Sequence, residues 1–139
     1  MKTPKPKTLQ PGDFQVNNTW LAYRINVAPI QVEGQAIDLY VLQDAASMFL
    51  FGNVLAPHGA DYPEAGEVEK LMESAHAKRN EWPSEILLPG AHGPSNSFVK
   101  VAKKLGITVR SVPESQMSFY IKDTQEGYEE FLSRGTSDA

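Results

Sequence analysis

One short segment of the sequence combines residue types that could hold an anion. Residues 89–97 read PGAHGPSNS, where Gly93 precedes Ser95, Asn96 and Ser97 at the start of an amphipathic pattern. Glycines followed by hydroxyl and amide side chains at a helix start can offer backbone N–H groups to a negative charge. Ordinary helix capping uses the same residue types, and the lysine of a phosphate-binding loop is missing. The segment is open to both interpretations, an anion site or a capped helix start.

A second candidate is the aspartate in LYVLQDAASMFLFGNVL, a stretch with two strand-like apolar runs. Asp44 stands in the break between the runs, and Ser47 follows three residues later. Aspartates in such breaks commonly accept hydrogen bonds from the backbone amides of a turn. We interpret Asp44, Ser47 and Gly52 as structural residues of this turn. The catalytic alternative is that Asp44 forms a carboxylate set with Asp38 and Glu85. The spacing of these three residues does not require them to meet.

Patterns for metal binding and nucleophilic catalysis are weak. The histidines lie 18 and 16 residues apart, at His58, His76 and His92, without the i, i+4 pair that marks zinc hydrolases. The chain has no cysteine, and the GxSxG pattern of hydrolases does not occur. We therefore expect no metal, no cofactor and no catalytic residue.

The elements that would position these residues begin with three strands. Apolar residues alternate with polar ones, or run together, over residues 20–27, 36–43 and 48–56. PIQVEGQ reads as a turn between the first two. Because the links are short, the three strands form an antiparallel meander.

Helices then alternate with strands. The predicted elements are a helix over 63–80, a strand centred on 86–88, a helix over 96–105 ended by Gly106, a strand over 107–112 and a last helix. The last helix is predicted to open at Asp123, because Asp123 and Glu126 have capping-box spacing. Right-handed crossovers make the last two strands parallel to a common neighbour. The prediction is an α/β fold with one mixed five-stranded sheet, strand order 3-2-1-4-5, and flanking helices.

Length and composition indicate one soluble domain. The chain has 139 residues, 41% hydrophobic and 22% charged, with no apolar run long enough to span a bilayer. We expect a flexible Lys/Pro leader over 1–13, the domain over 14–134 and a disordered tail over 135–139. The leader has no apolar stretch behind it, so we do not expect it to be a signal peptide. With no cysteine, a cytoplasmic location is expected.

Charge and apolar residues bear on the partner. Three of the 13 basic residues lie in the leader, which leaves 10 basic against 17 acidic residues, or −7, for the body. Nucleic-acid binders usually present a basic face, so this body argues against nucleic acid as partner. The apolar segment SQMSFYI, residues 115–121, is a candidate contact for another protein or a second copy in a homodimer.

Two stretches resemble the catalytic cores of transposases and retroviral-type integrases, which have a ribonuclease H-like fold. VLQDAASMFLFGNVL carries Asp44, Ser47 and Gly52 in the places where these cores have Asp, Ser or Thr, and Gly. EILLPGAHGPSNSFVKVAKKLGITV resembles the stretch around their fourth strand and following helix. Together the matches cover about residues 20–112. The resemblance implies that this chain has a ribonuclease H-like fold.

The same resemblance argues against the family's reaction. That chemistry needs carboxylates on paired divalent ions, one from the first strand and one from just after the fourth. The first strand here has no acid, and Asn26 is its nearest polar candidate. After the fourth strand the chain reads Pro89, Gly90, Ala91, His92. We therefore expect a non-catalytic binding or regulatory domain that acts through protein contacts. The alternative is a metal-dependent phosphodiester hydrolase, or an anion-substrate enzyme, with an unrecognised site near residues 90–97.

Overall fold

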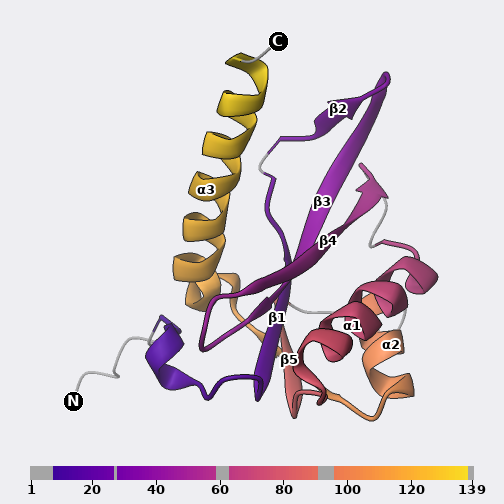
Figure 1. The fold of residues 1–139 in the computed structure, drawn as a ribbon, viewed down its shortest axis with the longest axis vertical. Coiled ribbons are helices and arrows are strands. Elements are labelled where there is room, and N and C mark those ends of the chain that lie inside the picture. Colours follow the sequence, from indigo (N-terminus) through magenta and orange to yellow (C-terminus); the bar gives the residue numbers. More distant parts are fainter. Residues whose placement is uncertain (1–7, 27, 59–62, 91–95, 138–139) are drawn as a thin grey trace.

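A mixed β-sheet forms the centre of the computed structural model, with helices on both faces (Figure 1). The structure describes residues 8–26, 28–58, 63–90 and 96–137. The strands are β1 (Thr19–Arg24), β2 (Ile30–Val32), β3 (Gln35–Asp44), β4 (Leu50–Pro57), β5 (Glu85–Pro89) and β6 (Thr108–Val112). The α-helices are α1 (Ala65–Arg79), α2 (Ser97–Lys104) and α3 (Ser118–Ser137), with short 3-10 turns at Pro11–Asp13 and Glu114–Met117.

The order of the five long strands is the predicted one. β1 pairs antiparallel with β3 on one side and parallel with β5 on the other. β4 continues the sheet beyond β3, and β6 continues it beyond β5. The predicted mixed α/β sheet is therefore confirmed, and the whole sheet has six strands because β2 is added.

The added strand β2 lies in the segment that was predicted to be a turn. It pairs with the start of β3 through a tight hairpin, in which Glu33 and Gly34 have φ of 48° and 81°. Two successive positive φ values are typical of hairpin turns that match the twist of the strands. The turn is therefore only the Glu33–Gly34 corner, and the residues before it extend the sheet.

β1 ends earlier than predicted, at Arg24 instead of residue 27. Arg24 pairs with Tyr40, and Ile30 pairs with Ile37. The chain from β1 to β2 therefore uses six residues where β3 uses three. The chain between β1 and β2 therefore bulges away from the ladder. In the bulge, Asn26 replaces a backbone partner, because its Oδ1 accepts from Leu39 N at 2.7 Å.

Each face of the sheet has its own apolar core. Trp20, Leu42 and Ile86 pack with α1 and α2 on one face. On the other face, Leu21 and Val41 pack with Met117 and Tyr120 around the start of α3. Figure 1 shows this division, with α1 and α2 on one side of the sheet and α3 on the other. Because β1 contributes to both cores, it is buried on both faces except at Arg24.

Gly52 lies inside β4 and not in the turn to which the sequence assigned it. A Cβ atom at this position would lie 2.9 Å from Leu71 Cδ1 of α1. The absence of a side chain therefore permits the close approach of α1 to β4. The predicted left-handed Gly106 after α2 is confirmed, with φ of 74°.

The last helix starts five residues before Asp123, so the prediction of its start was wrong. The chain enters α3 directly from the turn at Glu114–Met117. Met117, Tyr120 and Thr124 are buried on one helix face, and this packing against the sheet fixes the helix start. The capping-box spacing of Asp123 and Glu126 therefore lies within the helix, where it caps nothing.

The structured part also extends past both predicted domain boundaries. Leu9, within the predicted leader, donates its backbone N–H to Gln116 O at 2.8 Å and packs on the core under α3. At the other end α3 continues to Ser137, into the predicted tail over 135–139. No helix in the described ranges is both long and apolar enough to cross a bilayer.

The SQMSFYI segment does not form the expected apolar patch. Met117 and Tyr120 are fully buried against the sheet, and Phe119 is the large apolar side chain that this segment exposes. The hydrophobic residues of the segment therefore mainly close the core.

Candidate functional site

Two neighbouring parallel strands place their carboxyl ends at one edge of the sheet. β1 and β5 run in register, with Thr19 opposite Glu85 and Leu21 opposite Leu87. In sheets of this class, the carboxyl ends of such strands are where ligands bind. A cavity of about 250 Å³ opens at this edge, lined by Arg24, Asn26, Pro89, Glu114, Ile121 and Gln125. The cavity contains one exposed carboxylate, that of Glu114, and one guanidinium.

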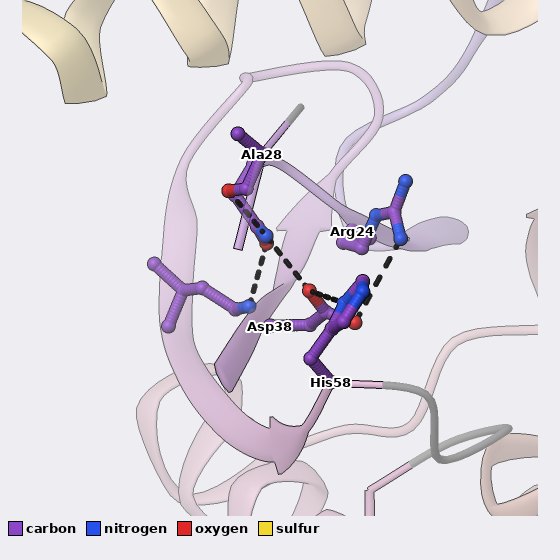
Figure 2. A network of polar contacts seen from close by, with 6 residues as sticks. Arg24, Ala28, Asp38 and His58 are labelled. Carbon is purple, nitrogen blue, oxygen red and sulfur yellow. Dashed lines mark hydrogen bonds and ion pairs between the residues drawn. The ribbon is translucent and has the colours of Figure 1, made fainter. Parts of the chain in front are cut away.

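A polar network surrounds the end of β1 (Figure 2). Its centre is the buried carboxylate of Asp38 on β3. Asp38 Oδ1 accepts from Asn26 Nδ2 at 2.9 Å and lies 3.2 Å from His58 Nδ1, while Oδ2 lies 3.7 Å from Arg24 NH1. Arg24 and His58 are each about half exposed, at 46% and 48% of their side chains. The carboxylate therefore has charged or polar partners on both oxygens.

These partners stabilise the ionised form of Asp38. Burial alone raises the pKa of this carboxyl, but the hydrogen bonds from Asn26 and His58 and the charge of Arg24 outweigh it. The pKa of Asp38 therefore lies below its ordinary value.

Asn26, the predicted polar candidate of the first strand, is fully used by the fold. Its Nδ2 donates to Ala28 O at 3.1 Å as well as to Asp38, and its Oδ1 accepts from Leu39 N. The amide thus holds the bulge between β1 and β2 in place.

The residues at this edge do not fit a pair of divalent cations. In the sequence, no Asp or Glu occurs from 14 to 32, which includes β1 and the segment after it. None occurs from 86 to 113, which includes β5 beyond its first residue, Glu85, and the segment after it. Hard divalent ions require several oxygen ligands, carboxylates above all. The cavity instead offers the Arg24 guanidinium, which repels a cation. Among the described residues, no group of three His, Asp or Glu side chains is placed to hold a metal.

Asp44 lies at the other end of β3 and serves the turn there. Its Oδ1 accepts from Asn17 N at 2.7 Å, and its Oδ2 accepts from Ser47 N at 2.8 Å and from Ser47 Oγ at 2.7 Å. The side chain is completely buried. These contacts fix the backbone before β1 and the turn before β4.

The carboxylate set of Asp38, Asp44 and Glu85 does not come together. Asp38 is six residues from Asp44 along β3, about 20 Å in a strand. Glu85, at the start of β5, binds Arg110 Nε at 3.1 Å and accepts from Thr19 Oγ1 at 2.9 Å. Arg110 is the main reason why the pKa of Glu85 is lowered. Each carboxylate therefore has its own structural partners.

The anion candidates fall partly outside the described residues, where Gly93 and Ser95 lie. Asn96 caps α2, and its Oδ1 accepts from Phe98 N at 2.8 Å and from Val99 N at 3.3 Å. An anion at this helix start would need these same amides. Ser97 Oγ is buried and has no hydrogen-bond partner in the described part of the chain. The contacts favour helix capping over anion binding.

The histidines are also dispersed. His76 stacks on Trp82 with ring centroids 4.3 Å apart, and His58 belongs to the Asp38 network. His92 lies outside the described residues. His76 and His58 thus have different neighbours, and in the described part of the chain neither belongs to a group that could hold a metal ion.

Comparison with solved structures identifies the fold. No protein-family model and no curated protein sequence matches the chain. A chain of the simian T-cell lymphotropic virus intasome, solved in complex with the PP2A regulatory subunit B56 gamma, superposes with a TM-score of 0.61 at 16% identity. The match covers 96% of this chain and 44% of that chain. The chain has the fold of a retroviral integrase core.

Two isolated catalytic cores show the same integrase-type fold. The HTLV-2 integrase catalytic core domain, in complex with magnesium, gives a TM-score of 0.56 at 15% identity, covering 88% of this chain and 74% of that one. The catalytic core domain of BIV integrase gives 0.53 at 14% identity, with the same coverage of 88% and 74%. The present chain spans less than half of the intasome chain. At these identities the likeness establishes the ribonuclease H-like fold only.

The sequence did not reveal the network at the end of β1. Arg24 read as a polar residue on one face of a strand, and His58 as a surface or cap histidine. The signal that could have revealed it is the strand pairing of the integrase-type fold. This pairing brings the end of β1, the start of β3 and the end of β4 to one edge of the sheet. Only the bulge at Asn26 decides which side chains meet Asp38.

Proposed function

We propose that this chain is a non-catalytic binding or regulatory domain on the integrase-type fold, acting through protein contacts. The observation that carries the proposal is the edge at the carboxyl ends of β1 and β5. There the chain has Arg24, a structurally committed Asn26 and an acid-free segment after β5.

A guanidinium cannot ligate a metal ion, so Arg24 does not supply what two-metal phosphoryl chemistry requires at this edge. Two-metal hydrolysis needs converging carboxylates to hold both ions and neutralise them. Asp38 is the nearest buried carboxylate, and its oxygens already face Arg24, His58 and Asn26. A divalent ion would have to displace these partners. The network therefore supports a structural role for Asp38 in the present chain.

The test is a cleavage assay on the purified full chain. Labelled single-stranded and double-stranded DNA and RNA are incubated with millimolar magnesium or manganese. We expect no cleavage above background and no change in the thermal midpoint with either metal, since a ligand bound only by the folded state would raise it.

The matched variants are Asp38→Asn and Glu67→Gln, the latter changing an exposed carboxylate paired with Lys70 on α1. Metal-dependent cleavage that Asp38→Asn abolishes and Glu67→Gln retains would establish a relocated hydrolase site and overturn the proposal. Metal-dependent cleavage that survives in both variants and co-purifies with the chain would overturn the proposal too, because it would place the reaction at a site other than Asp38.

A further inference from the structure

A long groove runs between α3 and the face of β3 and β4 on the same side of the sheet. We call it the α3 groove. Its volume is about 500 Å³, and it is lined by Ile25, Leu39, Val41, Gln43, Met48, Leu50, Gly52, Asn53, Asp123, Thr124, Gly127 and Tyr128. It is distinct from the cavity at the end of β1, with which it shares no lining residue.

The floor of the α3 groove is apolar, and the polar side chains buried in it are already paired. Tyr23 OH donates to Gln43 Oε1 at 2.7 Å and lies 2.7 Å from Thr124 Oγ1. Gln43 Nε2 donates to Met48 O at 3.0 Å. An apolar occupant would therefore leave none of these buried groups without a partner, which would otherwise be costly.

Exposed apolar side chains continue the groove along β4. Leu50 is 46% exposed and Leu55 is 52% exposed. Leu55 pairs with Leu39 and Leu50 pairs with Gln43, so both lie on the sheet face that forms the floor. The apolar surface is thus wider than the cavity itself.

Gly127 widens the groove from the helix side. It lies inside α3, where a glycine costs about 1 kcal/mol relative to alanine. A Cβ atom built on Gly127 meets nothing within 4 Å. Packing within the chain therefore does not require glycine here, whereas an occupant of the groove gains space from it.

The charge in the lining of the α3 groove is negative. Asp123 is exposed, and Glu126 is exposed three residues further along α3. The lining residues include Asp123 and no cation. A partner with basic residues beside its apolar ones would complement this surface.

The geometry favours a helix over an extended peptide. The groove lies on the face of the sheet, where the strands already pair with one another, so an added strand would find no backbone partners. A helix satisfies its own backbone hydrogen bonds and presents apolar residues at i, i+3, i+4 and i+7. We propose that the α3 groove binds an amphipathic helix of a partner protein, with its apolar side in the groove and lysines or arginines toward α3. This inference rests on the proposed function and assigns the contact surface.

The probe is a labelled Lys/Leu model peptide with leucines at helical spacing, and fluorescence anisotropy measures its binding to the full chain. We expect micromolar affinity. Gly127→Leu fills the groove and weakens binding by about tenfold or more. Ser118→Leu, an uncharged change to the same residue type on α3 and outside the groove lining, leaves affinity unchanged. Asp123→Asn weakens binding severalfold and reduces its salt dependence.

Circular dichroism verifies that each variant is folded. Leu50→Ser, on the sheet side of the groove, is a second variant for which weaker binding is expected. Equal affinity for Gly127→Leu and the parent chain would overturn the inference, because non-specific charge attraction does not depend on that residue. Equal binding of a Glu/Leu peptide would overturn it as well. A dimer seen by analytical ultracentrifugation that Gly127→Leu dissociates would show that the occupant is a second copy. The cleavage assay above is independent of all these outcomes.

Discussion

The two buried aspartates of β3 show how partners determine what a carboxylate does. Asp44 accepts three hydrogen bonds from neutral donors and fixes a turn. Asp38 faces an amide, an imidazole and a guanidinium at the opposite end of the same strand. The two residues lie six positions apart in one strand, and their positions do not reveal their roles. Only their contacts show that Asp44 fixes a turn and that Asp38 is the centre of an ionic network.

Replacing Asp38 should change how stability depends on pH. Its folded-state pKa lies below the ordinary value of about 3.9, so its contribution is present above that pH and is lost as the pH falls through the folded-state pKa. We expect Asp38→Asn to lower the free energy of unfolding by about 1–2 kcal/mol at pH 7 and by less at pH 3. Urea unfolding at both pH values measures this.

Glu67→Gln is the control for this prediction, because Glu67 is exposed and lies 3.7 Å from Lys70. Its effect should be near zero at both pH values. An equal loss of stability at pH 7 and pH 3 in Asp38→Asn would contradict the role assigned to the ionised carboxylate.

At the scale of elements, helix starts follow two different rules in this chain. α2 begins where the sequence predicts, because Asn96 is both a favourable cap residue and the residue before the apolar stripe. α3 begins earlier, because the burial of Met117 and Tyr120 adds a turn of helix before the local capping signal. Tertiary packing overrides local propensity where the two compete.

This difference predicts opposite outcomes for two similar substitutions. Asn96→Ala removes the acceptor of Phe98 N and Val99 N and should cost about 1 kcal/mol of stability. Asp123→Ala lies within α3 and should be neutral or slightly stabilising, because alanine is the better helix former. Thermal and urea unfolding of both variants test this. A loss of 1 kcal/mol or so in Asp123→Ala would restore Asp123 as the helix start.

At the scale of the whole molecule, two tyrosines attach α3 to the sheet. Tyr120 OH donates to Ala45 O at 2.7 Å, and Tyr23 OH contacts Thr124 of α3. Burial is the main cause that raises the pKa of both phenols. Because the folded-state pKa is raised, the two phenols contribute fully to the free energy of unfolding below about pH 10, the ordinary pKa of tyrosine. This contribution is lost as the pH rises above that value.

Alkaline titration should therefore unfold the protein cooperatively. We expect the phenolate absorbance of Tyr23 and Tyr120 to develop together with the loss of far-ultraviolet circular dichroism. Tyr120→Phe removes one buried phenol and should reduce the amplitude of that step. Smooth ionisation of all tyrosines near pH 10 with the circular dichroism intact would show that these phenols are accessible in the folded state.

The sequence by itself determined the alternation of elements and the strand order, because apolar periodicity and short links leave few ways to close one sheet. It also determined that β1 and the segment after β5 lack carboxylates, since this depends on residue types alone. Tertiary structure decided the bulge at Asn26, the Asp38 network, the start of α3 and the α3 groove. These features depend on which distant side chains meet, and local patterns carry no information about that.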